Sequence, residues 1–398
     1  MLRHLLKLIW KRKSRNMMLS LEILLAFLVV FAIAALGLRY WQLYQLPTGH
    51  GWKTQWSVNI RAAQELPNDP AIFDNIKRSL LEMPEVASVA FSSFGTYEMS
   101  RWTSEYAKPD GSHVLTLDGM GVSDDYFATM DMQIAQGRFF SKMDDHADAA
   151  PVVINRRLAD QWFPGKDPLG QLYVEQTRSK KDGQRYRVVG VVEQFRSHGE
   201  YMDPVYFMLS RWIPGVGKEA AHSIMLKLKP GTPRTFETRL NARLKQIRND
   251  WNYVITTQAD ARASMLKTQT IPLVILAVIA AFLLVMVAFG LFGVLWQNTT
   301  QRIPEIGLRR ALGADAGDIY RQIIAEQCLL STGAMLIALA LLVQLPLTGV
   351  FGEALNWPVF FGAAALSAGL IYLLSLLCSL YPGWRAARLS PTQALHYE

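Results

Sequence analysis

Four long stretches of this 398-residue sequence carry almost no charge, and they limit what the chain can fold into. They run from Met17 to Leu38, Ile271 to Trp296, Cys328 to Phe351 and Ala354 to Trp384, with Glu22 as the one charged residue inside them. A helix needs roughly 20 apolar residues to cross the bilayer core, and each stretch is that long. Buried helices of a water-soluble protein are the alternative, but the remaining chain is too short to cover four such runs. The sequence therefore predicts an α-helical membrane protein with four transmembrane helices.

A cleaved signal peptide is the alternative interpretation of the first run, because basic residues precede it. The run is too long for that, and Tyr40 and Trp41, which suit a membrane interface, follow it in place of a small-residue cleavage site. Within this run we expect Glu22 to snorkel toward the nearby cytoplasmic surface, with contact to a partner helix as the alternative.

Lysine and arginine residues in the short loops predict the orientation, because they accumulate on the cytoplasmic side. Six precede the first run, four lie between the second and third, and two follow the fourth: Arg3, Lys7, Lys11, Arg12, Lys13 and Arg15; Arg302, Arg309, Arg310 and Arg321; Arg385 and Arg388. The connection between the third and fourth runs has none. We therefore expect a multi-pass protein of the bacterial cytoplasmic (inner) membrane with both termini cytoplasmic.

The expected segments follow from the runs and the orientation. They are a cytoplasmic basic N-terminus (1–16), transmembrane helices at 17–38, 271–297, 328–351 and 357–381, an outer domain (39–270), a cytoplasmic loop (298–327) and a cytoplasmic tail (382–398).

The positive net charge of +8 is a topology signal rather than a nucleic-acid-binding face. From Arg39 to Lys267 there are 29 basic and 26 acidic residues, so the outer domain carries 29 − 26 = +3, and the other twelve basic residues are the cytoplasmic ones. Both cysteines, Cys328 and Cys378, fall in apolar runs, so the outer domain has no disulfide to form.

The outer domain alternates helical and strand patterns without a regular repeat, which predicts a large α+β extracytoplasmic domain with room for two lobes. Helices are expected at 70–83, 126–132, 156–163 and 232–247, and strands at 86–91, 152–154, 172–176, 185–194 and 223–228. The strands at 172–176 and 185–194 should form a hairpin, and Asn155 should cap the helix that follows it.

No catalytic or metal-site motif is found in the sequence, so we expect no catalytic residue, no cofactor site and no metal site in this chain. The acidic pairs Asp124-Asp125 and Asp144-Asp145 could bind a cation, but solvated loop charges are the preferred interpretation.

Two cytoplasmic stretches point to a family. Residues 302–314 (RIPEIGLRRALGA) and 381–395 (YPGWRAARLSPTQAL) resemble the cytoplasmic patterns E-I-G-x-R-x-A-x-G-A and P-x-W-R-A-A-R-x-x-P-x-x-A-L of MacB/FtsX-type ABC transporter permeases. Five outer-domain stretches resemble the MacB periplasmic core domain: VSDDYF (122–127), GRFF (137–140), VVIN (152–155), FPGKDPLG (163–170) and VVGVV (188–192).

The resemblance implies a site that couples the chain to an ATPase. Pro304 and Glu305 suit the first turn of a short helix, where a missing N–H costs nothing and a carboxylate meets the positive dipole end, and Gly313 can end it. The residues implied in ATPase coupling are Pro304, Glu305, Ile306, Gly307, Leu308, Arg309, Arg310, Leu312 and Gly313, and those of the tail motif are Trp384, Arg385, Arg388 and Pro391. An ordinary interfacial loop helix is the alternative.

The resemblance also implies partners. Unlike fused MacB proteins, the sequence has no nucleotide-binding domain, so ATP and Mg²⁺ are expected in a separate ABC ATPase dimer. A second permease, identical or homologous, would complete the complex in the membrane lipid, and a periplasmic adaptor and an outer-membrane duct are further candidates.

Four helices per chain leave little room for a translocation path, so mechanotransmission is the expected function: ATPase motion drives the outer domains to export an antibiotic, a peptide or another small molecule. The alternatives are an FtsX-like regulator of a cell-wall hydrolase or sensor, and a lipoprotein-release permease.

Overall fold

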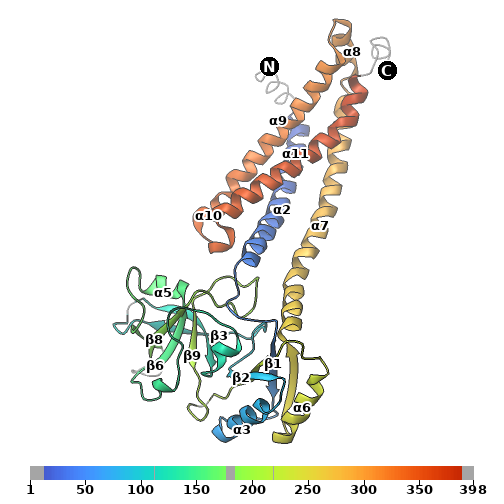
Figure 1. Ribbon diagram of the computed structural model, residues 1–398. Helices are drawn as coiled ribbons and strands as arrows, with labels where there is room; N and C mark the ends of the chain where they lie inside the picture. Colours follow the sequence, from blue (N-terminus) through green and yellow to red (C-terminus); the bar gives the residue numbers. More distant parts are fainter. Residues whose placement is uncertain (1–12, 112, 176–183, 218, 388–398) are drawn as a thin grey trace. The chain divides into compact units, whose positions relative to one another are not determined.

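The computed structural model describes residues 13–111, 113–175, 184–217 and 219–387, and they form two compact units (Figure 1). The membrane unit comprises the chain up to Gln42 and from Thr270 onward, and the α+β unit comprises Leu43–Gln269.

Four helices in the described part of the chain are long and apolar enough to cross a membrane, which confirms the predicted number. They are α2 (Lys13–Gln45), α7 (Gln258–Thr300), α9 (Ala316–Leu342) and α11 (Trp357–Ala387). Helix α7 starts well before its apolar run, so its residues through Gln269 belong to the α+β unit. The short helices of the membrane unit are α8 (Ile303–Ala311), α10 (Gln344–Thr348) and the 3₁₀ turn η2 (Gly352–Leu355).

The membrane helices pack through aromatic rings and small hydroxyl side chains. The rings of Phe31 on α2 and Phe360 on α11 meet edge to face at 5.4 Å. Between α9 and α11, the hydroxyls of Ser331 and Ser375 lie 3.0 Å apart, and Thr332 bonds Tyr372 at 2.7 Å in the same way. Hydroxyl pairs of this kind satisfy polar groups that lipid cannot hydrogen-bond.

Glu22 lies against Gly290 of α7. A Cβ added at Gly290 would stand 2.0 Å from the Glu22 carboxylate, so glycine makes room for it. The carboxylate therefore contacts a neighbouring helix, which was the alternative to snorkelling. Snorkelling of Glu22 toward the cytoplasmic surface stays a prediction.

The first lobe of the α+β unit is a four-stranded antiparallel sheet in the order β11-β1-β10-β2, with two helices. Its elements are β1 (Gln55–Arg61), α3 (Pro70–Leu81), β2 (Val86–Ser92), β10 (Ser223–Leu228), α6 (Phe236–Ile247) and β11 (Asn252–Thr257). This βαββαβ connectivity is ferredoxin-like. Each helix buries three apolar residues at helical spacing: Phe73, Ile76 and Leu80 on α3, and Phe236, Leu240 and Leu244 on α6.

The second lobe is inserted between β2 and β10 and is a closed six-stranded barrel. Its strands run in the order β4-β3-β7-β8-β6-β9, and β9 pairs back to β4 in parallel. They are β3 (Trp102–Ala107), β4 (Leu115–Val122), β6 (Ala150–Asn155), β7 (Leu172–Glu175), β8 (Arg185–Val192) and β9 (Phe207–Arg211). Three short elements lie beside them: α4 (Tyr126–Thr129), β5 (Ile134–Gly137), which pairs with β8, and the 3₁₀ turn η1 (Lys142–Asp144).

The barrel is filled at its centre and covered at one end. Tyr106, Tyr173 and Tyr186 pack together inside it, with ring centroids 5.4 to 5.7 Å apart. Helix α5 (Arg156–Trp162) adds Leu158 and Trp162 to this core, and the Trp162 indole donates to the His113 carbonyl across a 3.1 Å bond. No described helix covers the other end of the barrel, which we call the barrel mouth.

Most predicted elements of the α+β unit are confirmed, including the antiparallel β7–β8 hairpin and the cap at Asn155, whose side chain accepts from the Leu158 N–H. The loop between the hairpin strands, 176–183, lies outside the described residues. Two predicted helices are too long: α4 ends at Thr129, close to Asp131 with its φ of +51°, and α6 begins only at Phe236 after a turn. Strands β1, β3, β4, β5, β9 and β11 were not predicted.

Candidate functional site

Residues Ile303–Ala311 form helix α8 at the predicted coupling loop. Pro304 and Glu305 occupy its first turn, as expected. Gly313 ends it at a φ of +96°, and the Ala314 N–H donates to the Arg309 carbonyl at 3.0 Å. This is a Schellman ending, which needs a residue that tolerates the left-handed conformation.

The apolar side chains of α8 divide between two faces. Ile306 is 6% exposed and packs with Ile319 of α9 and Ala386 of α11 in a small core of its own. Leu308 and Leu312, one turn apart, are 56% and 80% exposed. One face of the helix is therefore held by its own chain, and the other is free to meet a partner.

A chain of polar contacts fastens α8 to α9. Arg309 bonds the Glu305 carboxylate at 2.6 Å and the Gln322 side-chain oxygen at 2.7 Å. Gln322 in turn donates to Glu326 at 3.0 Å, and Glu326 pairs with Arg302 at 2.5 Å. The side chains of Arg302 and Glu326 are only 15% and 14% exposed, so this last pair is shielded from water and stronger than a surface ion pair.

The described part of the tail motif stacks on the end of α7. The Arg385 guanidinium lies 4.4 Å from the ring centroid of Trp296, and Tyr381 stacks on Trp296 at 5.8 Å and on Trp384 at 6.2 Å. A Cβ at Gly383 would come within 3.0 Å of Tyr320, so α9 and α11 approach closely here. Through Ala386 and Ile306, the structure joins the tail to α8.

Gly307 is buried within α8, and three further predicted site positions are not fully described. Arg388 and Pro391 lie outside the described residues, as does the side chain of Arg310.

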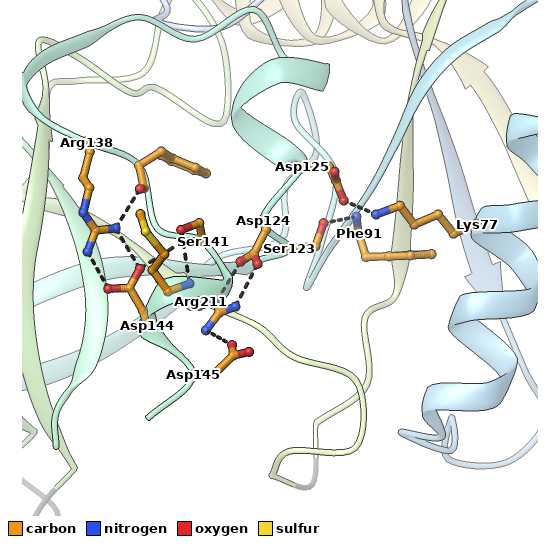
Figure 2. A network of polar contacts seen from close by, with 12 residues as sticks. Lys77, Phe91, Ser123, Asp124, Asp125, Arg138, Ser141, Asp144, Asp145 and Arg211 are labelled. Atoms are coloured by element: carbon orange, nitrogen blue, oxygen red, sulfur yellow. Dashed lines mark hydrogen bonds and ion pairs between the residues drawn. The ribbon is translucent and has the colours of Figure 1, made fainter. Parts of the chain in front are cut away.

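The two acidic pairs of the α+β unit are ion-paired (Figure 2), so they are not free loop charges. The prediction of solvated charges is wrong for Asp144, whose side chain is 7% exposed, whereas Asp125 and Asp145 stay 43% and 45% exposed. Arg211 lies between two carboxylates, Asp124 at 2.7 Å and Asp145 at 2.7 Å. Arg138 holds Asp144 at 2.6 Å, and Lys77 pairs with Asp125. The Arg138 guanidinium lowers the pKa of the Asp144 carboxyl below its ordinary value. Among the described residues, no three His, Cys, Asp or Glu side chains come together to hold a metal ion.

One site that the sequence reasoning missed is the buried Arg196, which follows β8. Its side chain donates to the carbonyl oxygens of Leu43 (3.0 Å), Pro47 (3.1 Å), Glu200 (2.7 Å), Met202 (3.3 Å) and Leu46. The carbonyls of the last turn of a helix lack intrahelical partners, so the guanidinium caps the end of α2.

The start of α7 is fastened to the same loop. Arg262 pairs with Glu200 and lies 4.4 Å over the Trp52 ring, and the buried Gln258 accepts from Thr96 at 2.7 Å. We call residues 196–200 with these partners the anchor. No periodicity or motif marks Arg196, since its acceptors are backbone atoms and three of the five lie about 150 residues away in the sequence.

Sequence profiles of two families match the chain. The MacB-like periplasmic core domain matches residues 21–243, and the FtsX-like permease C-terminal domain matches residues 277–391.

Two MacB proteins are similar to about two thirds of the chain. A macrolide export ATP-binding/permease protein MacB from Bdellovibrio bacteriovorus is 27% identical over 277 residues, 66% of this chain and 41% of its own length. A protein of the same name from Escherichia coli K12 is 30% identical over 298 residues, 70% of this chain and 43% of its own length. The chain thus spans less than half the length of these relatives.

Solved structures of periplasmic or extracellular domains are also similar. The periplasmic region of MacB from Actinobacillus actinomycetemcomitans aligns with 56% of this chain and 97% of its own, at 16% identity and a TM-score of 0.40.

Proposed function

Because this chain belongs to the MacB/FtsX-type family of ABC transporter permeases, we propose that it is a membrane subunit moved by a partner ATPase. The ATPase binds ATP and Mg²⁺ and supplies the chemistry, while this chain is non-catalytic and transmits motion. The α+β unit, outside the cytoplasmic membrane, uses that motion to export a substrate that is already there.

The observation that carries the proposal is the division of α8 into two faces. Its inner face is joined to α9 and α11 through Ile306 and the Arg302–Glu326 pair, so a push on the helix reaches both membrane helices. Its outer face presents Leu308 and Leu312, apolar anchors of the kind that a helix lays into a groove of another protein. An interfacial helix would need only the exposed leucines and would have no use for a tight connection to two membrane helices.

The orientation and the assembly follow the same proposal. Arg302, Arg309 and Arg321 around α8 favour a cytoplasmic position for it, where an ATPase dimer would meet two copies of the helix, one from each of two permeases. The relatives' names suggest a macrolide or another small molecule as the substrate.

The test is the isolation of the intact complex from its native membrane in mild detergent, with every subunit identified by mass spectrometry. We expect an ABC ATPase, and we expect the Leu308→Glu/Leu312→Glu variant to lose it. Leu81→Glu, at an exposed leucine on α3, is the matched control and should retain it. Retention of the ATPase by the double variant would refute docking through α8.

The identity of the remaining subunits distinguishes export from the other family functions. A copurifying cell-wall hydrolase would indicate regulation, and a bound acylated protein would indicate lipoprotein release. Transport of a substrate from the cytoplasmic side into the lumen of vesicles would contradict export from outside the membrane.

A further inference from the structure

The barrel mouth, at the end opposite α5, holds a cavity of about 860 Å³ between described residues, and the coupling role does not use it. Every barrel strand lines it, through Trp102 of β3, Gly119 and Gly121 of β4, Ala150 of β6, Glu175 of β7, Tyr186 of β8 and Ser210 of β9. Its volume is in the range of small-molecule sites, which often lie in barrel mouths.

Small residues create this space. Alternate residues along β4 point into the barrel. Leu117 fills the centre, and the next two inward positions toward the mouth are Gly119 and Gly121. A Cβ at Gly119 would stand 2.9 Å from the Trp102 ring, so glycine lets the indole lie flat across the strand. Larger inward side chains would have closed this end as Trp162 closes the other.

Aromatic rings form the walls and the floor. Trp102 is 39% exposed although it lines the cavity. Trp212 also lines it: this indole is 8% exposed, packs on Phe73 and Phe91, and donates to the Glu219 carbonyl at 2.9 Å. Tyr186, packed on the two inner tyrosines, forms the floor. Burial, and then the charge of Glu175, raises the pKa of Tyr186 well above its usual range.

The described lining is acidic, in a domain whose sequence is positive overall. Five described carboxylates line the cavity against one cation, Arg211, which two carboxylates already neutralise: the lining acids are Asp144, Asp145, Asp148, Glu175 and Glu219. Among the described side chains, Glu175 accepts from neutral hydroxyls alone, Ser104 at 2.8 Å and Tyr186 at 3.5 Å. Among the described residues, neither Asp148 nor Glu219 has an ion-pair partner.

We propose that this barrel mouth binds an organic cation with an apolar body. Its charge would lie near Glu175, Asp148 and Glu219, and its apolar body would pack between Trp102 and Trp212. Aromatic faces attract cations as well as apolar surface, so the rings and the carboxylates favour the same ligand. A bare metal ion would leave the apolar surface of the rings uncovered, and an anion would be repelled.

The inference goes beyond the proposed coupling, and it is tested without any ATPase, so each can fail alone. The full-length protein is placed in phosphatidylcholine nanodiscs, and equilibrium binding of radiolabelled tetraphenylphosphonium is measured with empty nanodiscs subtracted. Tetraphenylborate, which has the same shape and the opposite charge, is the paired probe. We expect saturable binding of the cation only.

The variant Asp148→Asn/Glu219→Gln removes two charges that hold no partner in place, so it should fold normally. We expect it to weaken tetraphenylphosphonium binding several-fold, and the addition of Glu175→Gln to bring the loss to at least about tenfold. Asp74→Asn, an exposed carboxylate on α3, is the control and should leave binding unchanged. Equal binding of tetraphenylborate, cation binding no greater than to empty nanodiscs, or unchanged affinity in the double variant would overturn the proposal.

Discussion

Helix α8 and the anchor both connect membrane helices to something else, but they are built in opposite ways. The contacts of α8 to α9 come from 25 consecutive positions, 302–326, and leave half of the helix exposed. The anchor gathers backbone atoms from distant segments around a buried arginine. A partner protein can bind a partly exposed helix and shift it. The contacts of a fully buried side chain, in contrast, either stay intact or break. We infer that α8 receives motion and that the anchor keeps the helix ends fixed to the α+β unit.

The largest effect should follow from breaking the anchor. Arg196→Met removes the side-chain donor to five carbonyl oxygens, and the bonds to Leu43, Glu200 and Met202 are buried. This loss should cost about 3–5 kcal/mol and lower the melting temperature of the α+β unit by about 10 °C. Differential scanning fluorimetry of the full-length protein in detergent measures this. Arg234→Met, which removes an exposed arginine paired with Asp260, should change the melting temperature by less than about 2 °C. Similar melting of the two variants would show that the anchor is not a fixed point.

A smaller and more local effect is expected at α8. Glu326→Gln leaves Arg302 shielded without its carboxylate, at a cost of about 1–3 kcal/mol. Hydrogen exchange of the α8 backbone amides should accelerate about tenfold or more, while amides of the α+β unit keep their rates. The swapped pair Arg302→Glu/Glu326→Arg should restore part of the protection. Unchanged exchange in Glu326→Gln would mean that Ile306 alone holds the helix.

The anchor should also respond to pH. His50 is buried and bonds the Arg196 carbonyl at 3.3 Å, and burial lowers its pKa below the ordinary value of about 6.5. The unfolded chain then takes up a proton before the folded one, so stability is full above about pH 6.5 and falls as the pH drops below it, by at most about 1.4 kcal/mol per pH unit.

Melting temperatures measured from pH 7.5 to 5.5 test this prediction. The His50→Gln variant should show a flatter pH dependence than the wild type, and His146→Gln, at an exposed histidine, should not. A wild-type slope that survives in His50→Gln would assign the acid sensitivity to another group.

The smallest effect is expected at the end of α8. A Cβ at Gly313 meets no atom within 4 Å, so Gly313→Ala should cost only the strain of a φ of +96°, about 1 kcal/mol. Gly317→Ala, in the first turn of α9 and equally open, should be neutral or stabilising because its backbone is helical. Hydrogen exchange at residues 308–312 measures the difference, and equal rates in the two variants would contradict this account of the helix end.

The same contrast explains what the sequence predicts. The membrane helices and α8 are visible because their signals are local: apolar length, a proline and a carboxylate in the first turn, and a glycine at the end. The barrel could not be predicted from the sequence, because its closure depends on the pairing of β4 with β9, whose paired residues lie about 90 positions apart. Strand β4 was missed because Gly119 and Gly121 interrupt its apolar pattern.

Charge was misjudged for a similar reason. The sequence predicts that Asp124 and Asp145 lie in loops. Nothing near them in the sequence indicates that the Arg211 guanidinium lies between their carboxylates. Burial of polar groups is decided by the tertiary fold, so the anchor and the barrel mouth could be found only in the structure.

The central claim is that the outer face of α8 meets an ATPase, and a photocrosslink tests it most directly. Benzoylphenylalanine is incorporated in place of Leu312, and in place of Leu81 as the control, and membranes containing the native complex are irradiated. The account predicts a crosslinked product at position 312 that contains an ABC ATPase and no such product at position 81. Crosslinks at position 312 to lipid alone, or to a protein that is not an ATPase, would contradict it.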